Sequence, residues 1–193
     1  MTTVDLALPT AEDLGLVREE TMRFDKTMGK EIRSAAVLNR EGSHRYLLSR
    51  IWDPKRPPLG FLMLNPSVAD AHTDDPTIGR CLSFARREKA GGLLVVNLFA
   101  ARSTDPKALA KLPDPVGEFN DSFIRHGVGE CETVVVAWGV HGRLNGRGRQ
   151  VADRLWDQGI ALRCLGVTQS GEPKHPLYLD KKTPLVPYAP PHT

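Results

Sequence analysis

Four apolar runs, each short enough to form a strand, divide the middle and the end of the chain. They are FLMLN (61–65), GGLLVVNLFA (91–100), TVVVAWG (133–139) and IALRCLGVT (160–168). A continuous apolar run is typical of a strand that is buried on both faces. Strands that alternate with helices favour a parallel sheet with helices on both sides. We therefore predict an α/β fold, a three-layer sandwich with a central, mainly parallel four-stranded sheet.

The segments between these runs are compatible with helices. IGRCLSFARREKA places Ile78, Cys81, Leu82 and Ala85 at helical spacing. DPKALAKL and the stretch around EFNDSFIRHGV predict short helices, and GRQVADRLWDQG predicts a helix that ends at Gly159.

The first part of the chain has a different pattern. Two β-compatible runs, SAAVLN (34–39) and HRYLLSRIW (44–52), flank a Gly-containing break and predict a β-hairpin that extends one edge of the sheet or caps one end. Residues 1–30 are polar and helix-compatible, with Thr10 as a candidate N-cap, so we interpret them as an appendage or a short helix. The 193 residues are predicted to form a single domain with its α/β core at 35–188.

Composition narrows the class of protein. Hydrophobic residues make up 40% and charged residues 25%, as in ordinary globular proteins, and the net charge of +3 does not by itself indicate a nucleic-acid partner. Cys81, Cys131 and Cys164 are far apart and form no CxxC pair, so we expect reduced thiols and predict neither a metal site nor a cofactor. Without a signal-peptide pattern or an apolar run of about 20 residues, we expect a cytoplasmic protein with no membrane partner. The oligomeric state is not predicted.

Polar residues stand where the predicted strands end. Asn65 is followed by Pro66 and Ser67, Asn97 lies within an apolar strand, and Trp138 precedes Gly139. The loop after the fourth strand carries His175 between prolines. Open parallel sheets bind ligands outside the carboxyl ends of their strands, so these residues are predicted to share one rim. Structural alternatives stay open: a turn at Asn65-Pro66, a structural hydrogen bond of Asn97, and packing of Trp138.

The loop after the first strand carries three carboxylates, Asp70, Asp74 and Asp75. Either the loop is solvated and Asp75 caps the helix that follows, or a carboxylate that faces the rim positions water as a general base. Asp74 and Asp75 are better placed for the second role than Asp70.

A basic, glycine-rich stretch follows the third strand. Arg143, Arg147 and Arg149 alternate with glycines, a pattern that suits phosphate binding near a helix start, although an exposed flexible loop is the alternative. GxxxxGK[ST], HExxH and GxSxG motifs are absent, and no GxGxxG opens a helix after the first strand.

Four blocks in order carry a resemblance: MLNPSVADAHTDDPTIGRC, GGLLVVNLFAARSTDP, VVVAWG and CLGVTQSGEPKHPLYL. Over about residues 35–188 the chain resembles a bacterial family labelled domain of unknown function 1643. More distantly, it resembles the uracil-DNA glycosylase superfamily, in which an Asp-Pro or Asn-Pro element, a base-reading Asn, a Trp-Gly or Leu-Gly element and a His-Pro loop follow in this order.

The distant resemblance implies roles for particular residues. Asn65 would position water, the turn at Pro66 and Ser67 and the Asn97 amide would hold the base, and His175 would approach the base oxygen. Trp138 would belong to the base-binding group. If the resemblance holds, either a carboxylate such as Asp75 supplies a base or none is required, and Arg143, Arg147 and Arg149 grip DNA phosphates. His-Pro-Leu stands here for the usual His-Pro-Ser, with Leu177 or Tyr178 as candidates for a DNA wedge.

The expected function is therefore a DNA glycosylase-like hydrolase that cleaves the N-glycosidic bond of a modified or damaged, flipped base. Two alternatives stay open. One is a hydrolase or transferase that acts on free nucleosides or nucleotides, and the other is a non-catalytic module that binds a modified base or nucleotide.

Overall fold

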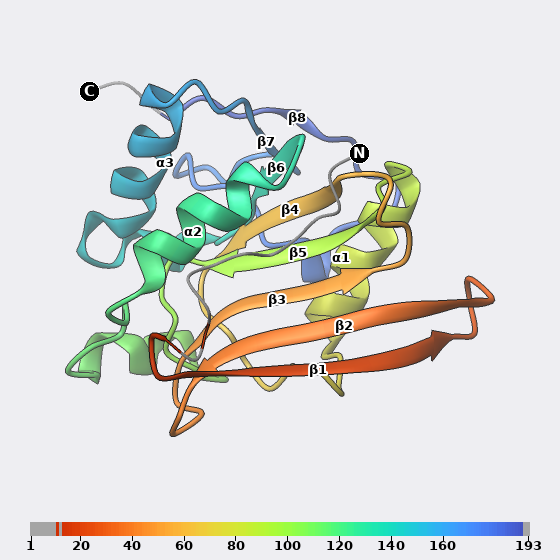
Figure 1. The fold of residues 1–193 in the computed structure, drawn as a ribbon. Helices are drawn as coiled ribbons and strands as arrows, with labels where there is room; N and C mark the ends of the chain where they lie inside the picture. Colours follow the sequence, from red (N-terminus) through yellow and green to blue (C-terminus); the bar gives the residue numbers. More distant parts are fainter. Residues whose placement is uncertain (1–10, 12, 191–193) are drawn as a thin grey trace.

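One mixed sheet runs through the molecule in the computed structural model, which describes residue 11 and residues 13–190 (Figure 1). Within these residues the sheet has eight strands in the order β1-β2-β3-β5-β4-β6-β7-β8. The strands are β1 (Leu16–Asp25), β2 (Lys30–Asn39), β3 (Arg45–Ile51), β4 (Pro58–Met63), β5 (Gly92–Asn97), β6 (Thr133–Val136), β7 (Leu162–Cys164) and β8 (Val186–Pro187).

The four apolar runs form the parallel centre of this sheet. β5, β4, β6 and β7 lie side by side and pair in parallel, with Met63 opposite Asn97 and Leu62 opposite Val136. The prediction of a four-stranded sheet was wrong, because β1, β2 and β3 add antiparallel strands on one side and β8 adds one on the other. The fold is thus mixed α/β with parallel strands only in the middle.

The N-terminal segment is the clearest correction. Leu16–Asp25 is a strand and not a helix, and it pairs along its whole length with β2. Its side chains are mostly exposed or half-buried, so it carries no apolar stripe that a sequence pattern could report. The pairing with β2 decides its conformation, and Thr10 lies outside the described residues. The predicted β-hairpin is confirmed as β2–β3, and it extends the sheet because β3 pairs with β5.

Helices cover both faces of the sheet (Figure 1). α1 (Pro76–Arg87) packs on one face through Ile78, Leu82 and Phe84, while α2 (Asn120–Gly129) and α3 (Arg147–Asp157) pack on the other. The described residues also include three short 3-10 helices in loops: η1 (Pro106–Lys111), η2 (Val140–Gly146) and η3 (Pro176–Tyr178). None of the helices in the described range is long and apolar enough to cross a membrane.

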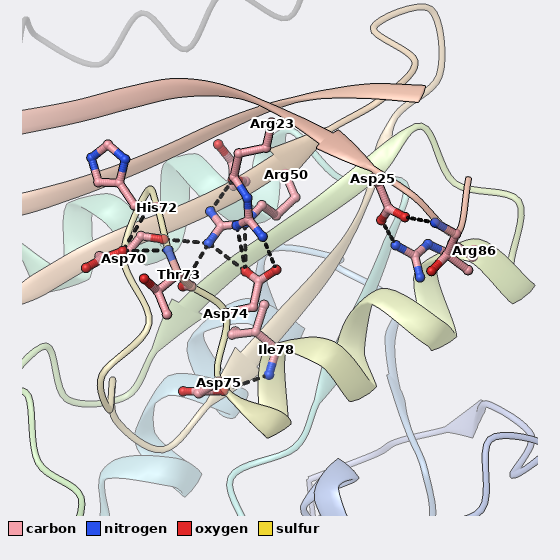
Figure 2. A network of polar contacts seen from close by, with 12 residues as sticks. Arg23, Asp25, Arg50, Asp70, His72, Thr73, Asp74, Asp75, Ile78 and Arg86 are labelled. Atoms are coloured by element: carbon pink, nitrogen blue, oxygen red, sulfur yellow. Dashed lines mark hydrogen bonds and ion pairs between the residues drawn. The ribbon is translucent and has the colours of Figure 1, made fainter. Parts of the chain in front are cut away.

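A network of arginines and aspartates fixes the loop between β4 and α1. Figure 2 shows the Asp74 carboxylate facing the guanidinium groups of Arg23 on β1 and Arg50 on β3. The Nη2 atoms of Arg23 and Arg50 each lie 2.8 Å from an oxygen of Asp74. Arg50 is only 1% exposed and also donates to the backbone oxygen of Asp70. Burial alone would raise the pKa of Asp74, but the two arginines outweigh it and hold this pKa below its ordinary value.

We expect Asp74→Asn to lower the free energy of unfolding by about 3–5 kcal/mol, because it leaves the buried Arg50 charge without its partner. Asp153→Asn is the matched control. It breaks the exposed pair with Arg149 and should cost less than about 0.5 kcal/mol. Urea unfolding of the three proteins measures both values.

The same pair predicts a pH dependence. Because the folded pKa of Asp74 is lowered, its contribution is present above the unfolded pKa and is lost as the pH falls through the folded value, below 3.8. Asp74→Asn should flatten the pH dependence of stability in this range. A variant that is as stable as the control, or as acid-sensitive as the wild type, would contradict the assignment.

Candidate functional site

A cavity of about 470 Å³ opens at the carboxyl ends of the parallel strands. β4 contributes Met63 and the residues after it, β5 contributes Asn97, and the segment after β6 contributes Trp138 and Gly139. The amino end of α1 and the loop around η3 complete the wall. This is the position at which open parallel sheets bind ligands.

Six of the ten residues singled out from the sequence line this cavity: Asn65, Ser67, Asp75, Asn97, Trp138 and His175. The structure therefore brings together side chains that are more than 100 positions apart in the chain. Pro66 is not among the lining residues, and its carbonyl oxygen accepts from the Asn65 amide and from the backbone nitrogen of Ser103. The chemical roles of the six lining residues remain predictions.

Asn65 presents a free acceptor. Its Nδ2 donates to the backbone oxygen of Pro66 at 2.9 Å and to that of Ser103 at 2.8 Å. Both partners are carbonyls and only accept, so the amide nitrogen must face them and Oδ1 must face away. Oδ1 accepts no hydrogen bond from any residue that the structure describes. Asn65 thus ties two loops together and leaves a carbonyl oxygen able to accept from water.

Asn97 presents the complementary group. The residue is 2% exposed, and its Oδ1 lies 3.5 Å from Nη2 of Arg45, a weak contact. Arginine only donates, so Oδ1 faces Arg45 and the Nδ2 donor is left over. Nδ2 has no partner in the described part of the chain, and Asn97 lines the cavity. The structural hydrogen bond predicted as the alternative role of Asn97 therefore engages only the oxygen of this amide.

His175 is held as a neutral imidazole. It stands at the start of η3, where its Nδ1 accepts from the backbone nitrogen of Leu177 at 3.4 Å. That bond places the ring proton on Nε2. Burial lowers the pKa of His175, and this effect exceeds the opposite influence of Asp75. At neutral pH the ring offers an uncharged N–H donor.

Asp75 caps α1, as the structural alternative predicted. Its Oδ1 accepts from the backbone nitrogen of Ile78 at 2.8 Å (Figure 2). Its other oxygen accepts from no described residue, and Asp75 lines the cavity. Asp74 and Asp70 are engaged elsewhere, Asp74 by arginines and Asp70 by the backbone nitrogens of His72 and Thr73. Asp75 is therefore the carboxylate of this loop that is placed to act in the cavity.

Trp138 forms part of the wall through packing. Its Nε1 donates to Glu172 at 2.7 Å, and its ring lies edge-on to Tyr188. Gly142 presses on the ring, since a Cβ added there would lie 1.9 Å from Cδ1 of Trp138. The indole N–H is thus not free to contact a ligand.

The three predicted phosphate-binding arginines do not gather at the cavity. Arg147 is 6% exposed, donates to the backbone oxygen of Leu98 and pairs with Asp121, so its guanidinium is engaged within the protein. Arg143 pairs with Glu172, and Arg149 pairs with Asp153 one helical turn away. None of the three lines the cavity.

Sequence reasoning missed several lining residues, of which Arg45 matters most. The others include Thr77, Ser103 and Thr104. Arg45 begins β3, and a charged residue at the start of a strand is ordinarily solvated. Only the antiparallel pairing of β3 with β5 turns it toward the cavity, and no local pattern reports that pairing. Among the described residues, no group of three or more His, Cys, Asp or Glu side chains is arranged to hold a metal ion.

The family described as "Protein of unknown function (DUF1643)" matches residues 45–177, more than half of the chain. The chain belongs to this family. The matched range begins at Arg45 and ends at Leu177, so it includes every lining residue of the cavity except Tyr178. The cavity is thus built almost entirely from the part of the chain that defines the family.

Other comparisons add little. No curated protein matches the chain. Among solved structures, the structure of esterase Est22 is similar at 9% sequence identity with a TM-score of 0.29. That comparison covers 77% of this chain and 41% of the esterase, so the chain spans less than half of the esterase's length. We draw no argument about fold or activity from a likeness at this level.

We expect Gly142→Ala to destabilise the fold by about 1–3 kcal/mol, because the added methyl group would overlap the buried Trp138 ring. Gly79→Ala is the control, since a Cβ added at this position in the interior of α1 would meet nothing within 4 Å. That change should stabilise by about 0.5–1 kcal/mol. Urea unfolding compares them, and equal effects of the two substitutions would contradict the packing described here.

We also expect His175 to titrate below its ordinary pKa of 6.5 and to carry its proton on Nε2 at pH 7. Its contribution to stability is present above the unfolded pKa and is lost as the pH falls through the lowered folded value. Long-range ¹H–¹⁵N NMR reports both the tautomer and the pKa. An imidazolium at pH 7, or a proton on Nδ1, would contradict the assignment.

Proposed function

We propose that this protein is a hydrolase that cleaves the N-glycosidic bond of a modified or damaged base flipped out of DNA. The observation that carries the proposal is the shared cavity lined by Asn65, Asn97 and His175, each of which has one polar side-chain atom without a partner among the described residues. The resemblance of the Asn-Pro, Asn, Trp-Gly and His-Pro order to the uracil-DNA glycosylase superfamily supports it. A cavity of about 470 Å³ has room for a planar base and an attacking water.

The three groups suit the charges that develop in this reaction. Breaking the bond to C1′ leaves an electron-poor sugar and gives the base negative charge. A neutral Nε2–H of His175 can donate to the base oxygen as that charge appears, and such a donor typically contributes roughly 3 kcal/mol to the transition state. The amide of Asn97 can donate to the base edge. Asn65 has no useful basicity, so its Oδ1 can only orient the water.

Asp75 is the group best placed to take the proton from that water. Asp75 lines the same cavity and has one oxygen without a described partner, whereas Asp70 and Asp74 are held by backbone and arginine donors. The cap to Ile78 fixes the carboxylate on a helix and not on a loose loop. The water proton would pass to Asp75 as the new bond to C1′ forms.

A second hollow beside the cavity provides a surface for the DNA strand. It is lined by Arg80, Lys181 and Lys182, and it shares Tyr178 with the cavity. Tyr178 is 87% exposed, so it is a better candidate for the wedge than the half-buried Leu177. These basic residues replace Arg143, Arg147 and Arg149 as the proposed phosphate contacts.

A hydrolase of free nucleosides or nucleotides is the second candidate. The observation that favours it is the engagement of all three predicted DNA-binding arginines in ion pairs within the protein. Turnover of mononucleosides that is insensitive to added DNA would distinguish this activity from base excision.

The proposal is tested by incubating the purified protein with single- and double-stranded oligonucleotides that carry assorted modified bases. We expect an alkali-labile abasic site with at least one of them. His175→Ala should slow base release by about 100-fold or more, because it removes the N–H donor. His72→Ala is the matched control, since His72 is exposed and does not line the cavity.

Each outcome has a defined meaning. Base release that His175→Ala and His72→Ala slow equally would contradict the role of the cavity. Tight binding of a modified oligonucleotide without any abasic product would instead indicate a non-catalytic reader. No release from any oligonucleotide or nucleoside by the wild type would overturn the proposal.

A further inference from the structure

Three arginines have almost no exposed surface, and they differ in their partners. Arg50 pairs with Asp74 and Arg147 pairs with Asp121. Arg45, at 3% exposure, forms no ion pair with any described carboxylate. A buried charge is costly unless it is paired, so Arg45 is the exception that requires a reason.

The contacts of Arg45 satisfy only part of its guanidinium. Nη1 donates to the backbone oxygen of Ala69 at 2.6 Å, and Nη2 lies 3.5 Å from Oδ1 of Asn97. The guanidinium has five N–H donors, so most of them have no strong acceptor. Arg45 lines the cavity, which is where an acceptor could enter.

Neighbouring charges do not compensate for this burial. Asp75 and Asp70 favour the charged form of Arg45, while Arg102 and Arg50 oppose it. Both carboxylates also accept backbone hydrogen bonds in their own loop. Burial is the largest influence and lowers the pKa of Arg45 to about 9, so the guanidinium is still charged at neutral pH.

We propose that Arg45 and Asn97 form an anion-binding subsite at the floor of the cavity, and that the ligand carries an anionic oxygen, such as a ring carboxylate, on the edge that faces them. Arg45 would supply the charge, and Nδ2 of Asn97 would add a second donor beside it. A neutral base would leave the buried charge unpaired. The inference rests on the proposed function, because it names the substrate class of the same cavity.

Isothermal titration calorimetry of the intact protein with free bases tests the subsite. The probes are uracil and its 6-carboxy derivative, cytosine and its 5-carboxy derivative, uridine monophosphate and inorganic phosphate. We expect wild type to bind at least one carboxylated base about 10- to 100-fold more tightly than its neutral parent, the range of a charged hydrogen bond. Arg45→Met should abolish that preference.

Two control variants separate charge from fold. Arg149→Met removes an exposed positive charge outside the cavity and should keep the preference. Arg45→Lys keeps a positive charge but lacks the planar guanidinium, so it should retain part of the preference for the carboxylated base. Thermal unfolding provides the structural control: Arg45→Met should keep a cooperative unfolding transition, because removal of an unpaired buried charge offsets the lost hydrogen bond to Ala69.

The results distinguish the source of the anion. Preference for uridine monophosphate, with displacement by inorganic phosphate, would support the subsite and assign it to a nucleotide phosphate. Equal affinity of wild type for acidic and neutral bases would overturn the inference, and so would a large loss of stability in Arg45→Met with the preference intact. If either of these two results came together with base release from DNA, the proposed function would still hold. Absence of any binding together with absence of base release would overturn both.

Discussion

The parallel pairing of β4 with β5 and β6 is the constraint on which the site depends. It sets Met63 beside Asn97 and Leu62 beside Val136, so the three strands end at the same level. Asn65, Asn97 and Trp138 meet for this reason, although they are separated by helices in the sequence. The continuous burial of these strands fixes their register, because a slip of one residue would turn every side chain to the opposite face.

The antiparallel strand β3 supports the site from one side. Arg45 and Arg50, at its two ends, donate to the backbone oxygens of Ala69 and Asp70 in the loop before α1. The Arg50–Asp74 pair fixes the same loop, so that Asp75 caps α1 and faces the cavity. The two arginines thus have different roles: Arg50 has a partner in the protein and stabilises the loop, whereas Arg45 keeps most of its donors open to the cavity.

The sequence predicts what depends on local pattern. The apolar runs report strands that are buried on both faces, and the rule that ligands bind at their carboxyl ends indicates Asn65, Asn97 and His175. The sequence does not predict Leu16–Asp25 as a strand, because a half-exposed edge strand carries no apolar stripe. Only the pairing of this segment with β2 defines it as a strand. Burial of Arg45 and Arg147 is hidden for a similar reason. Arginine is a residue type that is usually exposed. Only long-range packing places Arg45 at the cavity and Arg147 against Leu98.

The central claim is that the cavity binds a planar base through side chains from separate strands. NMR chemical-shift mapping with uracil and its 6-carboxy derivative tests it most directly. We expect the largest shifts at the side-chain amides of Asn65 and Asn97, the imidazole of His175 and the Nε–H of Arg45. Shifts confined to other surfaces, such as the hollow around Arg56 and Glu132, or no shifts at saturating concentrations of either base, would contradict the account.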